Sequence, residues 1–200
     1  MLRRQLFTAL KVTVVLLVLL CGVYPAAVWA VGQVAFKHQA DGSFVSSGGK
    51  VVGSALISQS FSDKDGNPIP KYFQPRPSAA GDGYDATASG GSNLGPSNPK
   101  LWNEVKGRVI AYRQLNALPN NASVPVDAVT ASGSGLDPDI SVANAMLQAS
   151  RVADVRGLPV ATVQSLVRAH TNGRPWGVLG EKTVNVLDLN LALDKLSPPG

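Results

Sequence analysis

The sequence has very few of the side chains that bind metals or form covalent cross-links. It contains one cysteine, Cys21, and two histidines, His38 and His170, in 200 residues. Because Cys21 lies inside a long apolar run, the rest of the chain has no thiol for a disulfide or a thiolate metal site. The two histidines are far apart in the sequence, with no carboxylate at ligand spacing. We therefore expect no metal site in this chain.

Negative charge and aromatic side chains are also scarce. No aspartate or glutamate occurs before Asp41, and aromatic residues make up only 6% of the chain. The net charge is +5, but Arg3, Arg4 and Lys11 supply three of these charges, which leaves two for the remaining sequence. Such a small, dispersed charge argues against a nucleic-acid surface. With 20 glycines and 14 prolines, the composition favours much ordered loop over a dense helical bundle.

One long apolar run organises the chain. Residues Val12–Val31 carry no charge, and about 20 helical residues cross a hydrocarbon core roughly 30 Å thick. The three basic residues precede this run, so the positive-inside rule places the N-terminus in the cytoplasm. We predict a cytoplasmic segment 1–11, a transmembrane helix 12–35 and an extracytoplasmic domain 36–200. We therefore expect a single-pass protein of the inner (plasma) membrane with a periplasmic main domain.

The same segment is compatible with a cleaved signal peptide. A basic start, an apolar core and Val28-Trp29-Ala30 before Val31 suit signal peptidase, and would release an exported periplasmic binding or interaction module. Against cleavage, the apolar character continues to Ala35. A lipoprotein signal at Cys21 is weaker, because the bulky Leu20 stands where a small residue is expected.

The first half of the domain is expected to contain little regular structure. Phe36–Gly49 reads as a polar connector, and Lys50–Phe61 has the β-branched character of a strand. A turn is expected at Asp65–Pro68. Lys71–Pro99 has no strand or helix periodicity, and a flexible linker would look similar. Its three aromatic side chains favour an ordered surface loop.

The second half alternates helices with short strands. Asn98 and Pro99 are suited to begin a helix that ends near Asn116 or Leu118. The other expected elements are a short strand at Val126–Thr130, a Gly/Ser loop at Ala131–Asp137, a helix from Pro138 or Ser141 to Arg156 stopped by Gly157, a helix from Pro159 to His170, and a final segment, Thr183–Leu196, that begins as a strand and turns helical near Asp188. The fold class is therefore α+β (a mixed α/β-type domain) on one transmembrane helix.

No catalytic constellation is convincing. Ser132, Ser134 and His170 could form a hydrolase site with Asp127 or Asp137, but Gly133-Ser134-Gly135 lacks the Gly-x-Ser-x-Gly spacing of a nucleophile elbow. The glycine-rich stretches match neither nucleotide-binding fingerprint. Asp137 and Asp139 are better explained as helix N-terminal residues than as cation ligands.

Several long motifs together resemble a known family. They are Tyr72–Ser78, Ser89–Asn98, Val126–Pro138, Arg151–Ala153 with Arg156–Leu158, His170-Thr171, Gly180-Glu181 and Val184–Asp194. In this order, behind one N-terminal span, they resemble the C subunit of the bacterial Kdp potassium-transporting ATPase, the KdpC family. Two positions depart from the family: Asp139, where histidine is common, and Lys182-Thr183, where Pro-Arg is common.

The resemblance implies a retained span and an accessory, non-catalytic role. The family works with a potassium-channel-like subunit, a P-type ATPase catalytic subunit and a small single-span subunit, in a complex that uses ATP, Mg and potassium. It is also described as a catalytic chaperone that raises the ATP affinity of the ATPase subunit. This chain lacks the phosphorylation motif Asp-Lys-Thr-Gly-Thr, so it is not the phosphorylated subunit.

The expected partner contacts follow from that role. We expect no catalytic residue, metal or cofactor of this chain's own, and contact with membrane lipid but not with nucleic acid. Direct nucleotide contact at Ser89–Asn93 conflicts with an outside domain, so any effect on ATP affinity would be indirect. The candidate partner-contact residues are Tyr72, Phe73, Arg76, Ser78, Ser92, Asn93 and Asn98, with Arg76 as a polar anchor.

Overall fold

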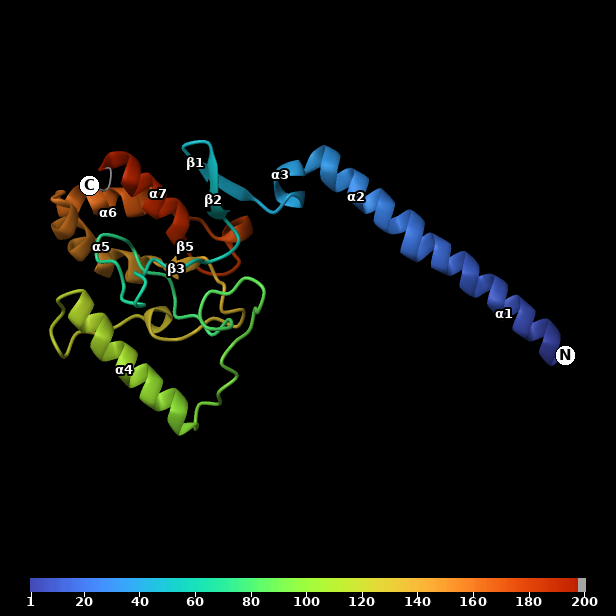
Figure 1. The fold of residues 1–200 in the computed structure, drawn as a ribbon, viewed down its shortest axis with the longest axis horizontal. Coiled ribbons are helices and arrows are strands. Elements are labelled where there is room, and N and C mark those ends of the chain that lie inside the picture. Colours follow the sequence, from blue (N-terminus) through green and yellow to red (C-terminus); the bar gives the residue numbers. More distant parts are fainter. Residues whose placement is uncertain (198–200) are drawn as a thin grey trace. The chain divides into compact units, whose positions relative to one another are not determined.

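The computed structural model describes residues 1–197 and divides the chain into two compact units, Met1–Phe44 and Val45–Gly200 (Figure 1). Each unit is described separately. The second unit contains most of the tertiary structure and all of the candidate partner-contact residues.

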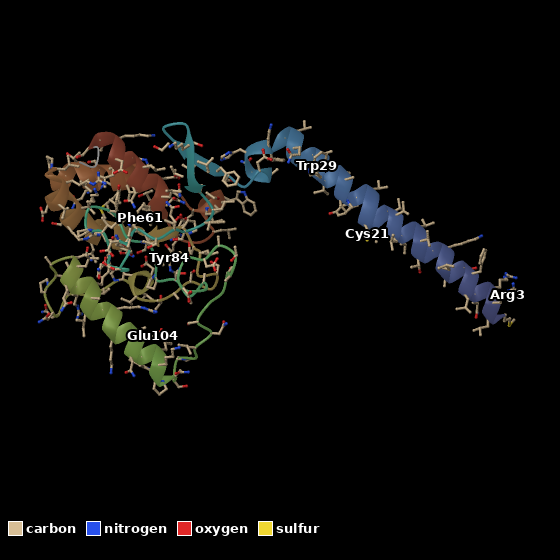
Figure 2. The ribbon with its side chains drawn as sticks, in the orientation of Figure 1. Arg3, Cys21, Trp29, Phe61, Tyr84 and Glu104 are labelled. Carbon is tan, nitrogen blue, oxygen red and sulfur yellow. The ribbon has the colours of Figure 1, made fainter. Side chains whose placement is uncertain are left out.

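The first unit is dominated by one continuous helical rod. It comprises α1 (Leu2–Leu17), a π-helical stretch η1 (Val18–Val23) and α2 (Tyr24–Ala35), followed by the short α3 (Lys37–Ala40). The 34 residues from Leu2 to Ala35 are long and apolar enough to cross a membrane. Pro25 has no backbone N–H to donate one turn back, which accounts for a π-helical irregularity just before it. Figure 2 shows Cys21 and Trp29 projecting from the surface of this rod.

The second unit begins with a β-hairpin. Strands β1 (Phe44–Ser47) and β2 (Lys50–Ser54) pair with each other. They are joined by Gly48 and Gly49, which have φ of 58° and 78°. Positive φ at both central residues is the geometry of a tight hairpin turn that glycine adopts without strain. The predicted polar connector is therefore wrong in part, since β1 forms within it, and the predicted strand 50–61 ends at Ser54.

A small antiparallel sheet lies at the centre of the second unit. Its order is β3 (Asp139–Ser141), β5 (Thr183–Asn185), β4 (Thr171–Asn172), and Ile140 pairs with Val184. Helices α5 (Val142–Arg156), α6 (Val160–Ala169) and α7 (Val186–Leu196) pack with it. The buried core consists of Phe73, Ile140, Ala145, Ala149, Val152, Ala153, Val163, Val167, Val184, Val186, Leu189 and Leu193.

The helix ends follow from local capping. The Ser141 hydroxyl accepts a hydrogen bond from Asn144 N at 3.1 Å, and Gly157 ends α5 at φ 64°. Asn185 caps α7 in the same way, by accepting from Asp188 N at 3.1 Å. These caps confirm the predicted helix ending at Arg156 and the predicted strand-to-helix change in the last segment.

Asp137 and Asp139 do not cap a helix, so that prediction is wrong. The Asp137 carboxylate pairs with Arg76 at 2.8 Å, and Asp139 accepts from the Thr183 hydroxyl at 2.6 Å. Both carboxylates are recruited by distant side chains, while Ser141 takes the capping position.

Helix α4 (Pro99–Leu115) is capped by Asn98, whose side chain accepts from Lys100 N at 2.9 Å, as predicted. The strand predicted at 126–130 is wrong: Val126–Ala128 forms a 3-10 turn, η2. Its Asp127 carboxylate accepts from Ser141 N and from the Asn144 side chain, at 2.8 and 3.0 Å. These bonds attach residues 126–128 to the start of α5, so the segment does not join a sheet.

Candidate partner-docking surface

Residues 70–74 of the second unit form a turn and an irregular segment that belongs to no sheet. Side chains of two helices bond the backbone of this segment. Asn190 on α7 accepts from Phe73 N at 2.9 Å and donates to Phe73 O at 3.0 Å. Gln148 on α5 does the same with Gln74, at 2.7 and 3.1 Å. We call Gln148 and Asn190 the amide clamps. Together they satisfy four backbone groups of neighbouring residues.

A buried arginine holds the start of the same segment. Arg151 is 6% exposed. Its guanidinium donates to Pro70 O, to Tyr72 O at 3.0 Å, to Asn116 Oδ1 at 2.9 Å and to Gln148 Oε1 at 2.8 Å. All four acceptors are neutral, and burial lowers the pKa of Arg151 to about 10. The side chain is therefore charged at neutral pH and is solvated by carbonyl groups rather than by a carboxylate.

A second arginine fastens the outer edge of the segment. Arg156 donates to Lys71 O at 2.8 Å and pairs with Asp194 at 2.6 Å. Its guanidinium also lies 5.0 Å from the Tyr72 ring centroid, and the Tyr72 hydroxyl donates to Asp194 at 3.2 Å. Burial, and then the Asp194 charge, raise the pKa of Tyr72. The cluster ties the loop to the ends of α5 and α7.

The next part of the loop is attached to the Gly/Ser loop 131–137. Arg76 pairs with Asp137 at 2.8 Å, and the Ser78 hydroxyl donates to Gly135 O at 2.6 Å. Tyr84 folds the loop back on itself, because its hydroxyl donates to Arg76 O and its N–H donates to Ser78 Oγ, both at 2.8 Å. Burial raises the pKa of Tyr84 to about 12.

The two glycine-rich stretches lie directly against each other. Gly90 N donates to Ser134 O at 2.8 Å. A Cβ on Gly91 would lie 3.0 Å from Gly133 O, and one on Gly135 would lie 2.6 Å from Gly90 O. Glycine is therefore needed here for the close approach of two backbones. The Gly90 N–H is used within the domain instead of being free for a phosphate.

The candidate residues of the first motif face the domain interior. Phe73 is 0% exposed and belongs to the core, so its side chain supports the loop from below. Tyr72, Arg76 and Ser78 are half-buried and make the internal bonds described above. Arg76 is thus an anchor between two loops of this chain, and contact of these residues with a partner stays a prediction.

The candidate residues of the second motif face outward. Ser92 and Asn93 are exposed, and Asn98 caps α4. Asn93 has φ 52°, a left-handed conformation that asparagine tolerates better than most residues. The exposed arm 92–98 is held at one end by the loop contacts and at the other by α4. A role for this arm in partner contact also stays a prediction.

Sequence reasoning missed the residues that hold the loop. Asn144, Gln148 and Arg151 are buried on α5 although they are polar, and Asn190 is buried on α7. The three α5 residues are spaced i, i+4, i+7, which places them on one helix face. Such a polar stripe beside the apolar one was the available signal.

A cleft of about 390 Å³ separates this loop from α4. Its floor includes the amide clamp Gln148 and the Tyr112 hydroxyl, which donates to Asn144 Oδ1 at 2.8 Å. Its walls include Pro75, Pro77 and Tyr84. Of the residues that hold the loop in place, Gln148 and Tyr84 line this cleft.

The serines and histidine of the hydrolase alternative make other contacts. The Ser132 and Ser134 hydroxyls lie 3.4 Å apart, and Ser134 Oγ accepts from Leu136 N. His170 Nδ1 lies 3.1 Å from Leu166 O in its own helix. Within residues 1–197 no three His, Cys, Asp or Glu side chains gather closely enough to hold a metal ion.

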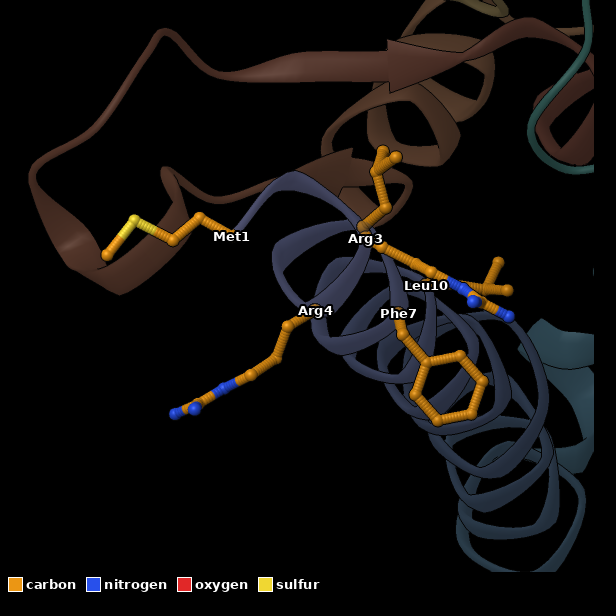
Figure 3. Close-up of a pocket in the computed structure, with 6 residues that line it drawn as sticks. Met1, Arg3, Arg4, Phe7 and Leu10 are labelled. Atoms are coloured by element: carbon orange, nitrogen blue, oxygen red, sulfur yellow. The ribbon is translucent and has the colours of Figure 1, made fainter.

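The basic end of the first unit presents charge along one helix. Met1, Arg3, Arg4, Leu6, Phe7 and Leu10 line a shallow hollow there. Figure 3 shows the Arg3 and Arg4 side chains extending away from the helix in different directions. Lys11 Nζ lies 4.7 Å from the Phe7 ring centroid. Long basic side chains next to an apolar span can reach the lipid headgroups.

The chain therefore has one apolar helix of membrane-spanning length, followed by an α+β domain. This domain carries a partly exposed loop, residues 70–98, which we call the pinned loop because side chains of α5 and α7 hold its first part. The sequence profile of the family described as KdpC, K+-transporting ATPase, c chain, matches residues 6–195. The chain belongs to this family.

Curated relatives match over nearly their whole length. Potassium-transporting ATPase KdpC subunits of Mycobacterium tuberculosis and Mycobacterium bovis are 56% identical over 194 residues, which covers 97% of this chain and 100% of theirs. The KdpC subunit of Koribacter versatilis is 47% identical over 196 residues, covering 98% of this chain and 97% of its own. These matches include the N-terminal helix and confirm the family resemblance.

Proposed function

We propose that this chain is an accessory, non-catalytic subunit of an ATP-driven potassium uptake complex. Its partners are a potassium-channel-like subunit, a P-type ATPase catalytic subunit and a small single-span subunit. The family match over residues 6–195 supports the complex, and the names of the relatives support its transported ion. The lack of an Asp-Lys-Thr-Gly-Thr motif supports a role other than phosphoryl transfer.

The helix Leu2–Ala35 is a retained single span with its N-terminus in the cytoplasm and the domain outside the inner membrane. The basic residues before the apolar run support this orientation. Retention, rather than cleavage before Val31, is supported by the apolar character that continues to Ala35 in one helix of 34 residues. An outer domain of this kind covers the potassium entrance of the channel-like subunit.

The pinned loop docks the domain onto its partner through the exposed arm 92–98. The observation that carries this proposal is that side chains hold residues 70–78, while the bond from Gly90 N to Ser134 O fixes the chain just before the arm. A surface loop that is already ordered loses less conformational entropy on binding. Any influence on ATP affinity is transmitted through the partner subunits, because the Gly90 N–H is already used by Ser134.

Substitutions at Asn93 test this docking role. Asn93→Gly removes the side chain and keeps the left-handed backbone, whereas Asn93→Ala also strains it by about 1 kcal/mol. We expect both variants to reduce the amount of partner subunits that co-purify with this chain from membranes. Asn121→Ala, at an exposed turn residue, is the matched control and should leave the yield unchanged. Wild-type recovery of all partners with Asn93→Gly and Asn93→Ala would refute the role of the arm.

A further inference from the structure

The connection between β4 and β5, residues 173–182, presents a concentrated apolar tip. We call it the tryptophan loop. Trp176 is 90% exposed, Val178 74% and Leu179 50%. Trp176 has φ 52° and Gly177 has φ 79°, so a bulky residue holds a left-handed conformation at the very tip. Large apolar side chains gathered in this way on an exposed turn mark an interaction site.

Positive charge surrounds the base of this loop. A hollow of about 670 Å³ beside it is lined by Arg168, Arg174 and Lys182 together with Glu181, Met146 and Val142. Glu181 pairs with Arg174 at 2.9 Å in an exposed position. An exposed ion pair of this kind contributes little to the stability of the fold. Three cationic side chains therefore face the hollow against one carboxylate. This charge is complementary to an anionic surface.

The tryptophan loop is followed by β5, which contacts the segment just after the β1–β2 hairpin. The β1–β2 hairpin is the first structure of the domain, and Ala55, just after it, accepts from the Asn185 side chain of β5 at 2.9 Å. A Cβ on Gly53 of β2 would lie 2.9 Å from Leu187 of α7. The hairpin thus packs against β5 and the start of α7, and β5 is the strand that leaves the tryptophan loop.

The covalent connection limits how far the hairpin can lie from the end of α2. Nine residues, 36–44, lie between Ala35, the end of α2, and Val45, where the second unit begins. The ten Cα-to-Cα steps from Ala35 to Val45 span at most roughly 35 Å even when fully extended. The covalent connection therefore keeps the start of the β1–β2 hairpin within that distance of the end of α2.

We propose that the tryptophan loop is an interfacial membrane anchor that binds anionic phospholipid. Trp176, Val178 and Leu179 enter the boundary between headgroups and acyl chains, where an amphipathic indole is favoured. Arg168, Arg174 and Lys182 bind the lipid phosphates through charge-assisted hydrogen bonds. This second attachment fixes the orientation of a domain that otherwise hangs from one helix. It requires the membrane helix but neither the proposed orientation nor the proposed partner contacts.

Depth-dependent fluorescence quenching tests the proposal in the full-length chain. The variant Trp29→Phe/Trp102→Phe retains only Trp176, and Trp29→Phe/Trp176→Phe retains only Trp102 as the matched control. Trp102 is also exposed, on α4. Each variant is reconstituted into vesicles of phosphatidylcholine alone or with phosphatidylglycerol, with brominated acyl chains as quenchers.

The expected result is blue-shifted, bromine-quenched emission from Trp176 in the phosphatidylglycerol vesicles and solvent-exposed emission from Trp102. Each neutralisation, Arg174→Gln or Lys182→Gln, should lower the ratio of inserted to free loop about fivefold. Exposed, unquenched emission from Trp176 in both kinds of vesicle would overturn the proposal. So would emission that shifts only when the partner subunits are added, because the loop would then bind protein instead of lipid.

Discussion

The amide clamp Asn190 offers the sharpest test of how the loop 70–78 is held. Its carboxamide makes two bonds to the Phe73 backbone, 2.9 and 3.0 Å long, and its side chain is 1% exposed. Asn190→Leu keeps a similar volume but leaves one N–H and one C=O buried without partners. Each unsatisfied group costs about 1–3 kcal/mol, so we expect the free energy of unfolding to fall by about 2–6 kcal/mol.

Two measurements on the full-length protein check this prediction. Urea unfolding in detergent micelles gives the change in stability, and hydrogen exchange gives the protection of the Phe73 amide. We expect the Phe73 amide to lose protection in Asn190→Leu before the α5 amides do, because the loop opens first. Asn121→Leu, at an exposed position, should change the stability by no more than about 0.5 kcal/mol. An Asn190→Leu protein as stable as wild type, with a protected Phe73 amide, would refute the clamp.

Two further predictions concern the loop contacts. Gly135→Ala places a Cβ 2.6 Å from Gly90 O at φ 68°, so we expect a loss of about 2–4 kcal/mol in urea unfolding; a neutral effect would contradict the close packing. The pKa of Tyr84, raised by burial from 10.0 to about 12, means that the folded state keeps a proton that the unfolded state loses. Its contribution to stability is complete below pH 10 and is lost as the pH rises toward 12. Tyr84→Phe should show a shallower fall of unfolding free energy over that window; an identical slope would contradict this assignment.

Elements with strong local signals could be predicted from the sequence. The helix ending at Arg156 has a glycine at its left-handed terminus, and the last segment carries both a β-branched start and a capping Asn185. The helix at Pro99 has Asn98 as its cap. In each case the determining contact is made within a few residues of the element itself.

Elements decided by distant contacts could not be predicted. Val126–Ala128 looks like a strand, but its central Asp127 is bonded to Ser141 and Asn144 at the start of α5. The loop at 70–78 is ordered by side chains that lie 61 to 122 positions later in the sequence. No local pattern near residue 73 indicates that Asn190 will bond the backbone there.

The partner-contact role of the candidate residues stays a prediction, although the structure shows how the loop that carries them is held. The two motifs in Tyr72–Ser78 and Ser89–Asn98 do form one continuous loop beside the Gly/Ser loop 131–137. Within it, Phe73 and Arg76 are directed to internal contacts, because a buried aromatic ring and an ion pair to Asp137 stabilise the loop. The arm 92–98 is more exposed, and its contact with a partner stays a prediction.

Photo-crosslinking from the arm in intact membranes tests the central claim most directly. A photoreactive amino acid replaces Asn93, and the same residue at Asn121 serves as the control. We predict a cross-link from position 93 to the channel-like subunit of the potassium-transporting complex, made from the outer side of the membrane, and none from position 121. Absence of this product in membranes that contain the assembled complex, or a product formed only on the cytoplasmic side, would contradict the account.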